Sequence, residues 1–165
     1  MARKMLVMAA VAAALVTTAM PALAAPGSAS RNGHTLSASN ATDLDPAGET
    51  ITVTGTGYDS TKGYYVALCR VPDDYSYGST PTPCLGGDGQ GGTGAGPSAW
   101  VTNTPAGSNP SVPIAADGSF TAQIHLKQAG GNLDCAQVTC AIVTRRDHLG
   151  LFDRSFDVFV PASWS

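Results

Sequence analysis

The sequence has few charged residues, and the basic ones are the scarcer. Lysine and arginine number 9 of 165 residues, against 12 aspartates and glutamates. Affinity for phosphate backbones comes mainly from lysine and arginine contacts, and the chain has no basic stripe. We therefore expect no direct binding of nucleic acid by this protein.

Motifs of common catalytic and metal sites are also missing. The chain contains no G-x-S-x-G, no H-E-x-x-H and no glycine-rich phosphate loop between a strand and a helix. Its cysteines do not form a C-x2-C pair, and no histidine lies at ligand spacing beside them. These absences predict a protein that is not an enzyme and has no metal site.

Long hydrophobic runs are absent except at the N-terminus. Arg3 and Lys4 precede an apolar run at 5–19 and a small-residue A-x-A site at 22–24. This order predicts a signal peptide over residues 1–24, hence a secreted protein without a transmembrane segment after cleavage. Cleavage removes two of the nine basic residues, and the seven that remain face twelve acidic ones, a net charge of −5.

Four cysteines remain after the predicted cleavage. An even count in an exported chain indicates disulfides, and four cysteines allow three pairings. The simplest choice joins the near neighbours, Cys69 with Cys84 and Cys135 with Cys140. Each bond would close a short loop, which stabilises a fold by roughly 2–3 kcal/mol.

The remaining chain shows short alternating runs rather than helical periodicity. Strands are predicted at 34–39, 49–57, 63–71, 99–102, 119–127, 138–145 and 154–160, separated by Gly, Pro, Asn and Asp. Seven such strands favour a two-sheet sandwich, with a barrel as the alternative. The domain would span 34–161 after a flexible leader at 25–33. A long loop at 72–113 is rich in Gly, Pro and Ser, and mobility is expected at 88–96.

Residues 44–58 (LDPAGETITVTGTGY) contain a V-x-G-x-G motif, and 64–69 (YYVALC) contain a Y-x-V-x-x-C motif. These segments resemble the neocarzinostatin family, in which the same two motifs form the opening and the following strand. Residues 116–120 (ADGSF) are similar to its D-x-G-S element, with Asp117 directly before Gly118, and 134–143 (DCAQVTCAIV) match its D-C-x4-C segment. The resemblance implies a seven-stranded immunoglobulin-like β-sandwich, and it supports the pairs Cys69–Cys84 and Cys135–Cys140.

The resemblance also implies a function. The family's best-known members are antibiotic apoproteins, which hold an enediyne chromophore non-covalently in a cleft on one sheet. The matching positions here are Tyr65, Ala67, Cys69, Val71, Ala141, Val143 and Arg145, with Cys84 and Leu85 as the floor. The antibiotic carriers keep smaller residues at the positions of Tyr65, Ala67, Val143 and Arg145. A smaller cleft is therefore expected, holding either a different small hydrophobic ligand or chromophore or no small ligand.

The densest charged cluster lies at 145–148 and 153–154. One interpretation is an anion-recognising rim formed by Arg146, Asp147 and His148. The other is a solvated loop with internal Arg–Asp pairs. The T-R-R-D-H segment is also similar to domains that lie beside haem-acquisition domains in actinobacterial surface proteins. That resemblance implies the alternative function, a non-catalytic cell-envelope domain that is associated with the cell wall or a partner there and is accessory to haem acquisition. The residues themselves suggest a separate hypothesis, in which His148 ligates haem iron together with Tyr75 or Tyr77.

Overall fold

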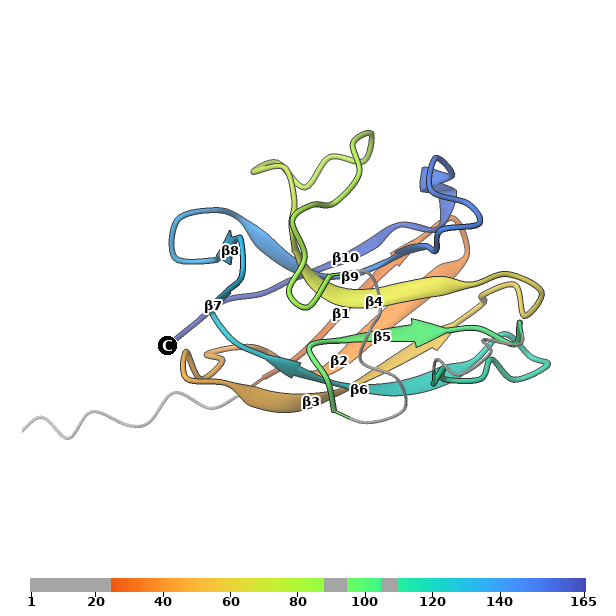
Figure 1. Ribbon diagram of the computed structural model, residues 1–165, viewed down its shortest axis with the longest axis horizontal. Coiled ribbons are helices and arrows are strands. Elements are labelled where there is room, and N and C mark those ends of the chain that lie inside the picture. Colours follow the sequence, from red (N-terminus) through yellow and green to blue (C-terminus); the bar gives the residue numbers. More distant parts are fainter. Residues whose placement is uncertain (1–24, 88–94, 105–109) are drawn as a thin grey trace, which may run out of the picture.

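The computed structural model describes residues 25–87, 95–104 and 110–165, which form two packed β-sheets (Figure 1). The first sheet has the order β1-β2-β3-β6 and the second the order β10-β9-β4-β5, and all neighbouring strands are antiparallel. The strands of the first sheet are β1 (Ala25–Arg31), β2 (His34–Thr42), β3 (Glu49–Thr56) and β6 (Phe120–Leu126). Those of the second are β4 (Tyr64–Arg70), β5 (Ser98–Val101), β9 (Cys140–Arg146) and β10 (Val158–Pro161).

Two smaller elements complete the described fold. The short hairpin of β7 (Ala129–Gly130) and β8 (Leu133–Asp134) precedes β9, and the 3-10 helix η1 (Arg154–Phe156) precedes β10. The predicted all-β immunoglobulin-like sandwich is therefore confirmed, although each main sheet has four strands, so that the sandwich has one strand more than predicted. The predicted signal peptide at 1–24 lies outside the described residues, as does most of the segment expected to be mobile at 88–96.

Alternation along the strands explains how the two sheets pack together. On β6 the apolar residues Phe120, Ala122, Ile124 and Leu126 are buried, while Thr121 and Gln123 between them are exposed. Successive residues of a strand point to opposite faces, so one face of the sheet becomes apolar. The second sheet supplies Tyr64, Val66 and Leu68 from β4 to the same core.

The predicted flexible leader at 25–33 is wrong in the structure. Residues 25–31 form β1, which pairs with β2 and ends in a turn at Asn32 and Gly33. Both turn residues have positive φ, 51° and 82°, as the Asn-Gly pair of a two-residue hairpin turn requires. The leader's Ser, Gly and Ala content suggested flexibility, but pairing with β2 determines the local structure.

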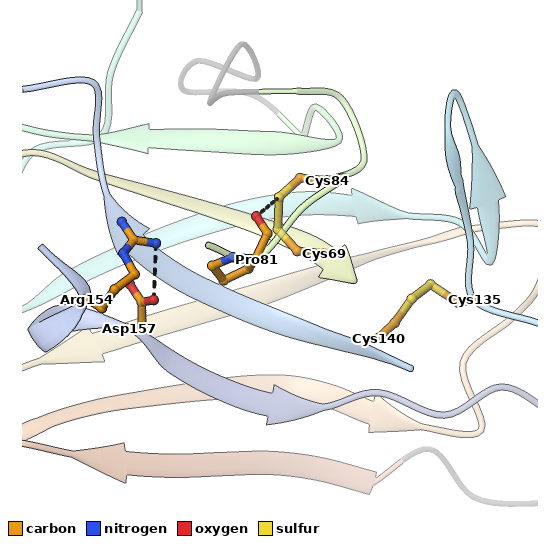
Figure 2. Close-up of a disulfide and its surroundings, with 7 residues drawn as sticks. All are labelled: Cys69, Pro81, Cys84, Cys135, Cys140, Arg154 and Asp157. Atoms are coloured by element: carbon orange, nitrogen blue, oxygen red, sulfur yellow. Dashed lines mark hydrogen bonds and ion pairs between the residues drawn. A yellow bond between two sulfur atoms is a disulfide. The ribbon is translucent and has the colours of Figure 1, made fainter. Parts of the chain in front are cut away.

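Both predicted disulfides are confirmed. Cys69 is bonded to Cys84, and Cys135 to Cys140 (Figure 2). The first bond fastens residue 84 beside β4, where the amide of Leu85 also donates to the carbonyl of Leu68 over 2.8 Å. The second joins the end of the β7–β8 hairpin to the start of β9. The two bonds thus attach residue 84 and the β7–β8 hairpin to the same end of the second sheet, where β4 ends and β9 begins.

Candidate functional site

Five of the predicted cleft positions lie together on the outer face of the second sheet. Ala67, Cys69 and Val71 from β4 and the residue after it, together with Ala141 and Val143 from β9, form one buried cluster. Phe159 of β10 completes this outer-face cluster. The alternate residues of the same strands belong to the interior core, so the structure separates the two faces as strand geometry requires.

The outer-face cluster is covered by the chain itself. Tyr75 and Cys84, both from the segment around the first disulfide, pack against it. The ring of Tyr77 stacks on Phe159 with 4.3 Å between ring centroids and 22° between ring planes. The guanidinium carbon of Arg31 lies 4.0 Å from the Tyr77 ring centroid. The loop closed by the first disulfide therefore occupies the face on which an open cleft was expected.

A hollow of about 430 Å³ remains at the side of this loop. It lies between residues 82–87 and the turn of the β7–β8 hairpin, and Arg145 forms part of its wall. Its other lining residues are Thr82, Pro83, Cys84, Gly86, Gly87, Gly130, Gly131 and Asn132. Of the predicted cleft positions, Cys84 and Arg145 line this hollow.

Leu85 does not lie with the other predicted cleft positions. Its side chain belongs to the interior core and is 6% exposed. Cys84, by contrast, packs against the outer-face cluster. Consecutive residues beside β4 point to opposite faces, so Cys84 and Leu85 do not share a floor.

Tyr65 and Arg145 form a second group of polar and aromatic side chains at the other end of the face. They are opposite each other in the β4–β9 pairing, and the Arg145 guanidinium carbon lies 5.5 Å from the Tyr65 ring centroid. The Tyr65 hydroxyl and Nδ1 of His148 share a hydrogen bond of 2.7 Å. The ring of His148 lies 5.4 Å from that of Trp100 on β5. His148 itself is exposed.

Two of the three predicted rim residues are buried rather than exposed. Arg146 and Asp147 have exposed fractions of 8% and 0%. Nε of Arg146 donates to the carbonyl of Gly63 over 3.2 Å, and Nε1 of Trp100 donates to Oδ2 of Asp147 over 3.1 Å. The guanidinium also pairs with Asp153 at 3.6 Å. The second interpretation from the sequence, a solvated loop with internal Arg–Asp pairs, is right about the pairs. It is wrong about the solvation, because Arg146 and Asp147 are buried.

A further buried ion pair joins Arg154 and Asp157 (Figure 2). The two groups are 3.2 Å apart, and Asp157 is fully buried. Burial raises the pKa of the Asp157 carboxyl to about 7, although the charges of Arg154, Arg31 and Arg145 act in the opposite direction. In the described part of the chain, Oδ1 of this carboxyl has no hydrogen-bond partner.

Sequence reasoning missed the roles of Phe159 and Arg31. The alternation in 156–160 places Phe156, Val158 and Val160 in the core and so leaves Phe159 for the outer face, a signal that was available. Arg31 stood in the predicted leader, and no local pattern links it to Tyr77. Its position follows from the pairing of β1 with β2.

The described residues contain neither a group of potential metal ligands nor a helix that could cross a membrane. Within residues 25–87, 95–104 and 110–165, no three His, Cys, Asp or Glu side chains come together as metal ligands would. In the same residues, no helix is long and apolar enough to cross a bilayer. Haem ligation by His148 with Tyr75 or Tyr77 stays a prediction.

The sandwich and its two short-range disulfides define an all-β, immunoglobulin-like domain. Comparison of the sequence with known families gives the particular one. The chain belongs to the neocarzinostatin family, which it matches over residues 36–155.

Two individual proteins are similar to the chain. The protein named "Thiamine biosynthesis protein X" from Corynebacterium glutamicum is 32% identical over 101 residues, which are 61% of this chain and 49% of that protein. The chain thus spans about half the length of this relative. The solved structure of macromomycin aligns with 80% of this chain and 99% of its own, at 18% identity and a TM-score of 0.48.

Proposed function

We propose that this chain is a secreted, non-catalytic binding protein that holds a small ligand in the hollow beside the Cys69–Cys84 disulfide. The observation that carries the proposal is the position of this hollow. It adjoins the disulfide and the sheet face at which the resemblance to the antibiotic apoproteins predicts the cleft, and Cys84 and Arg145 line it. Family membership supports the same class of function, and two disulfides fit an extracellular protein.

The size of the hollow suits a small ligand, and its lining combines glycine and proline with the polar side chains of Thr82, Asn132 and Arg145. Its volume of about 430 Å³ lies toward the lower end of the range for small-molecule sites. Four glycines, Pro83 and Cys84 contribute to the wall, and the glycines let a flat molecule approach the backbone closely. Ala67 and Val143, which are larger than the matching residues of the antibiotic carriers, belong to the cluster against which Tyr75 and Cys84 pack. A ligand in the hollow would therefore lie beside the outer-face cluster instead of on it.

The proposal is tested on protein purified from its own culture medium in the cold and the dark. Native mass spectrometry should show a bound mass of small-molecule size that disappears on denaturation. An absorbance spectrum would distinguish haem from another chromophore. The protein mass should equal residues 25–165 less four hydrogens. Protein recovered at that mass without any bound species would contradict the proposal.

The second candidate function is a non-catalytic interaction domain of the cell envelope, accessory to haem acquisition. An exposed group of apolar side chains at Leu149, Leu151 and Phe152 favours attachment to some other surface. Fractionation of the producing cells checks this candidate, because an envelope domain would stay with the cells. Recovery of the protein only from the culture supernatant would contradict it.

A further inference from the structure

Three large apolar side chains within four consecutive residues project into solvent. Leu149, Leu151 and Phe152 have exposed fractions of 66%, 40% and 97%. Single exposed apolar residues are common on protein surfaces, but several large ones in one short loop are typical of a contact site. We call these three residues the apolar tip. The tip lies in the loop between β9 and η1, at one end of the sandwich (Figure 1).

The loop that carries the tip is held firmly by buried charges. The amide of Leu149 donates to Oδ1 of Asp147 over 3.0 Å, and the amide of Gly150 donates to the Asp147 carbonyl over 2.9 Å. The Arg146 guanidinium lies directly beneath Gly150, where an added Cβ would come within 2.6 Å of it. The apolar side chains are therefore presented by an ordered loop wound around Arg146.

The other flank of the loop is fastened to the β1–β2 hairpin. Nδ2 of Asn32 donates to the carbonyl of Ser155 over 2.8 Å. Arg31 donates to the carbonyls of Arg154 and Asp157. Both sides of the tip are thus connected to the sandwich, which favours a preorganised contact over one that must order a loose segment.

We propose that the apolar tip inserts into an uncharged lipid surface. The three side chains offer roughly 400 Å² of apolar surface, about half of what each partner buries in a stable protein–protein interface. A protruding tip without a surrounding apolar face suits a bilayer, which accepts any apolar projection, better than a protein that must supply a matching pocket. We therefore infer a lipid surface, because the tip protrudes and its area is too small for a stable protein–protein interface.

The charges around the loop favour uncharged over anionic headgroups. Three basic groups at its base pair with acids, Lys62 with Asp59 at 3.1 Å, Arg146 with Asp153 at 3.6 Å and Arg154 with Asp157 at 3.2 Å, while Arg31 donates to the carbonyls of Arg154 and Asp157. Above about pH 7, where Asp157 is ionised, the three pairs largely cancel in charge, and Arg31 by itself attracts anionic lipids only weakly. Association should therefore depend on apolar burial and change little with salt concentration.

The experiment measures co-flotation of the folded protein with phosphatidylcholine vesicles. Wild-type protein should float with the vesicles to the same extent at low and high salt. Phe152→Ser should weaken the partitioning by about tenfold or more, the effect expected for removing one aromatic ring from an apolar phase. Phe152→Leu serves as the matched control and should keep most of the binding. Since Phe152 is 97% exposed, all variants should have the wild-type unfolding temperature.

Several results would overturn the proposal. These are wild-type protein that does not float, flotation that Phe152→Ser leaves unchanged, or binding that needs anionic lipid and is lost at high salt. Analytical ultracentrifugation tests whether the tip binds a second copy of the chain. A wild-type dimer that Phe152→Ser converts to a monomer would show that the tip binds a second copy of the chain instead of lipid.

Discussion

Replacing Trp100 with phenylalanine tests whether the buried Arg146–Asp147 group stabilises the fold through its hydrogen bonds. The indole nitrogen donates to a carboxylate that is fully buried, over 3.1 Å. A hydrogen bond to a charged group contributes about 1.5–3 kcal/mol, and its loss leaves a buried oxygen with one donor fewer. The smaller ring adds a packing loss of about 1 kcal/mol. Trp100→Phe should therefore lower the free energy of unfolding by about 2–4 kcal/mol.

The chain offers a matched control in its second tryptophan. Nε1 of Trp164 is also buried, but it has no hydrogen-bond partner among the described residues. Trp164→Phe should therefore cost no more than the packing loss of about 1 kcal/mol, because it also removes a buried donor that has no partner. Equilibrium unfolding in guanidinium chloride, followed by far-UV circular dichroism with the disulfides intact, measures both variants. Equal losses for the two substitutions, within roughly 0.5 kcal/mol, would refute the reasoning.

Three further predictions concern other buried groups. The Asp157 carboxyl has a pKa of about 7 in the folded state, whereas in the unfolded state it releases its proton near pH 4. The free energy of unfolding should therefore fall by up to about 4 kcal/mol as the pH rises from about 4 to 7. Thermal unfolding across this range should show the fall in wild-type protein and not in Asp157→Asn; parallel curves would contradict it. Replacing both Cys69 and Cys84 by alanine should lower the free energy of unfolding by about 3 kcal/mol, because the disulfide closes a loop with a sequence separation of 15. An unchanged midpoint of denaturant unfolding would contradict this stabilisation by the disulfide. Gly63→Ala should cost at least about 2 kcal/mol, since its Cβ would lie 1.8 Å from Oδ2 of Asp147, and a wild-type melting temperature would disprove that crowding.

Much of the sandwich could be predicted because its signals are local. The alternation of Phe120, Ala122 and Ile124 predicts a strand with one buried face, and the structure confirms it. Trp100 was expected in a short strand within the long loop, and it lies in β5. The Asn-Gly pair at 32–33 was an equally local signal for a hairpin, but the polar composition around it concealed the strand.

The covering of the predicted cleft could not be derived from local patterns. Tyr75 and Tyr77 stand in a loop, where exposed tyrosines are the ordinary expectation. Phe159 and Arg31, which hold Tyr77 on both faces, come from opposite ends of the domain. Only the completed fold places these groups together.

The burial of the charged cluster was hidden for a similar reason. Arginine and aspartate are rarely buried unless they are paired, so Arg146 and Asp147 were expected at the surface. Their burial depends on Gly63 and Trp100, which lie far from them in the sequence and supply a carbonyl and an indole N–H. Pairing of β9 with β4, and of β4 with β5, makes that possible.

The most direct test of the central claim locates the ligand in the hollow. Native mass spectra would be recorded for wild-type protein, Asn132→Trp and Gln123→Trp, all secreted by the producing organism. Asn132 lines the hollow, so tryptophan there should fill it and abolish the bound small-molecule mass. Gln123 is exposed on β6 in the first sheet, and tryptophan there should leave the bound mass unchanged. A ligand retained equally by both variants would contradict binding in the hollow.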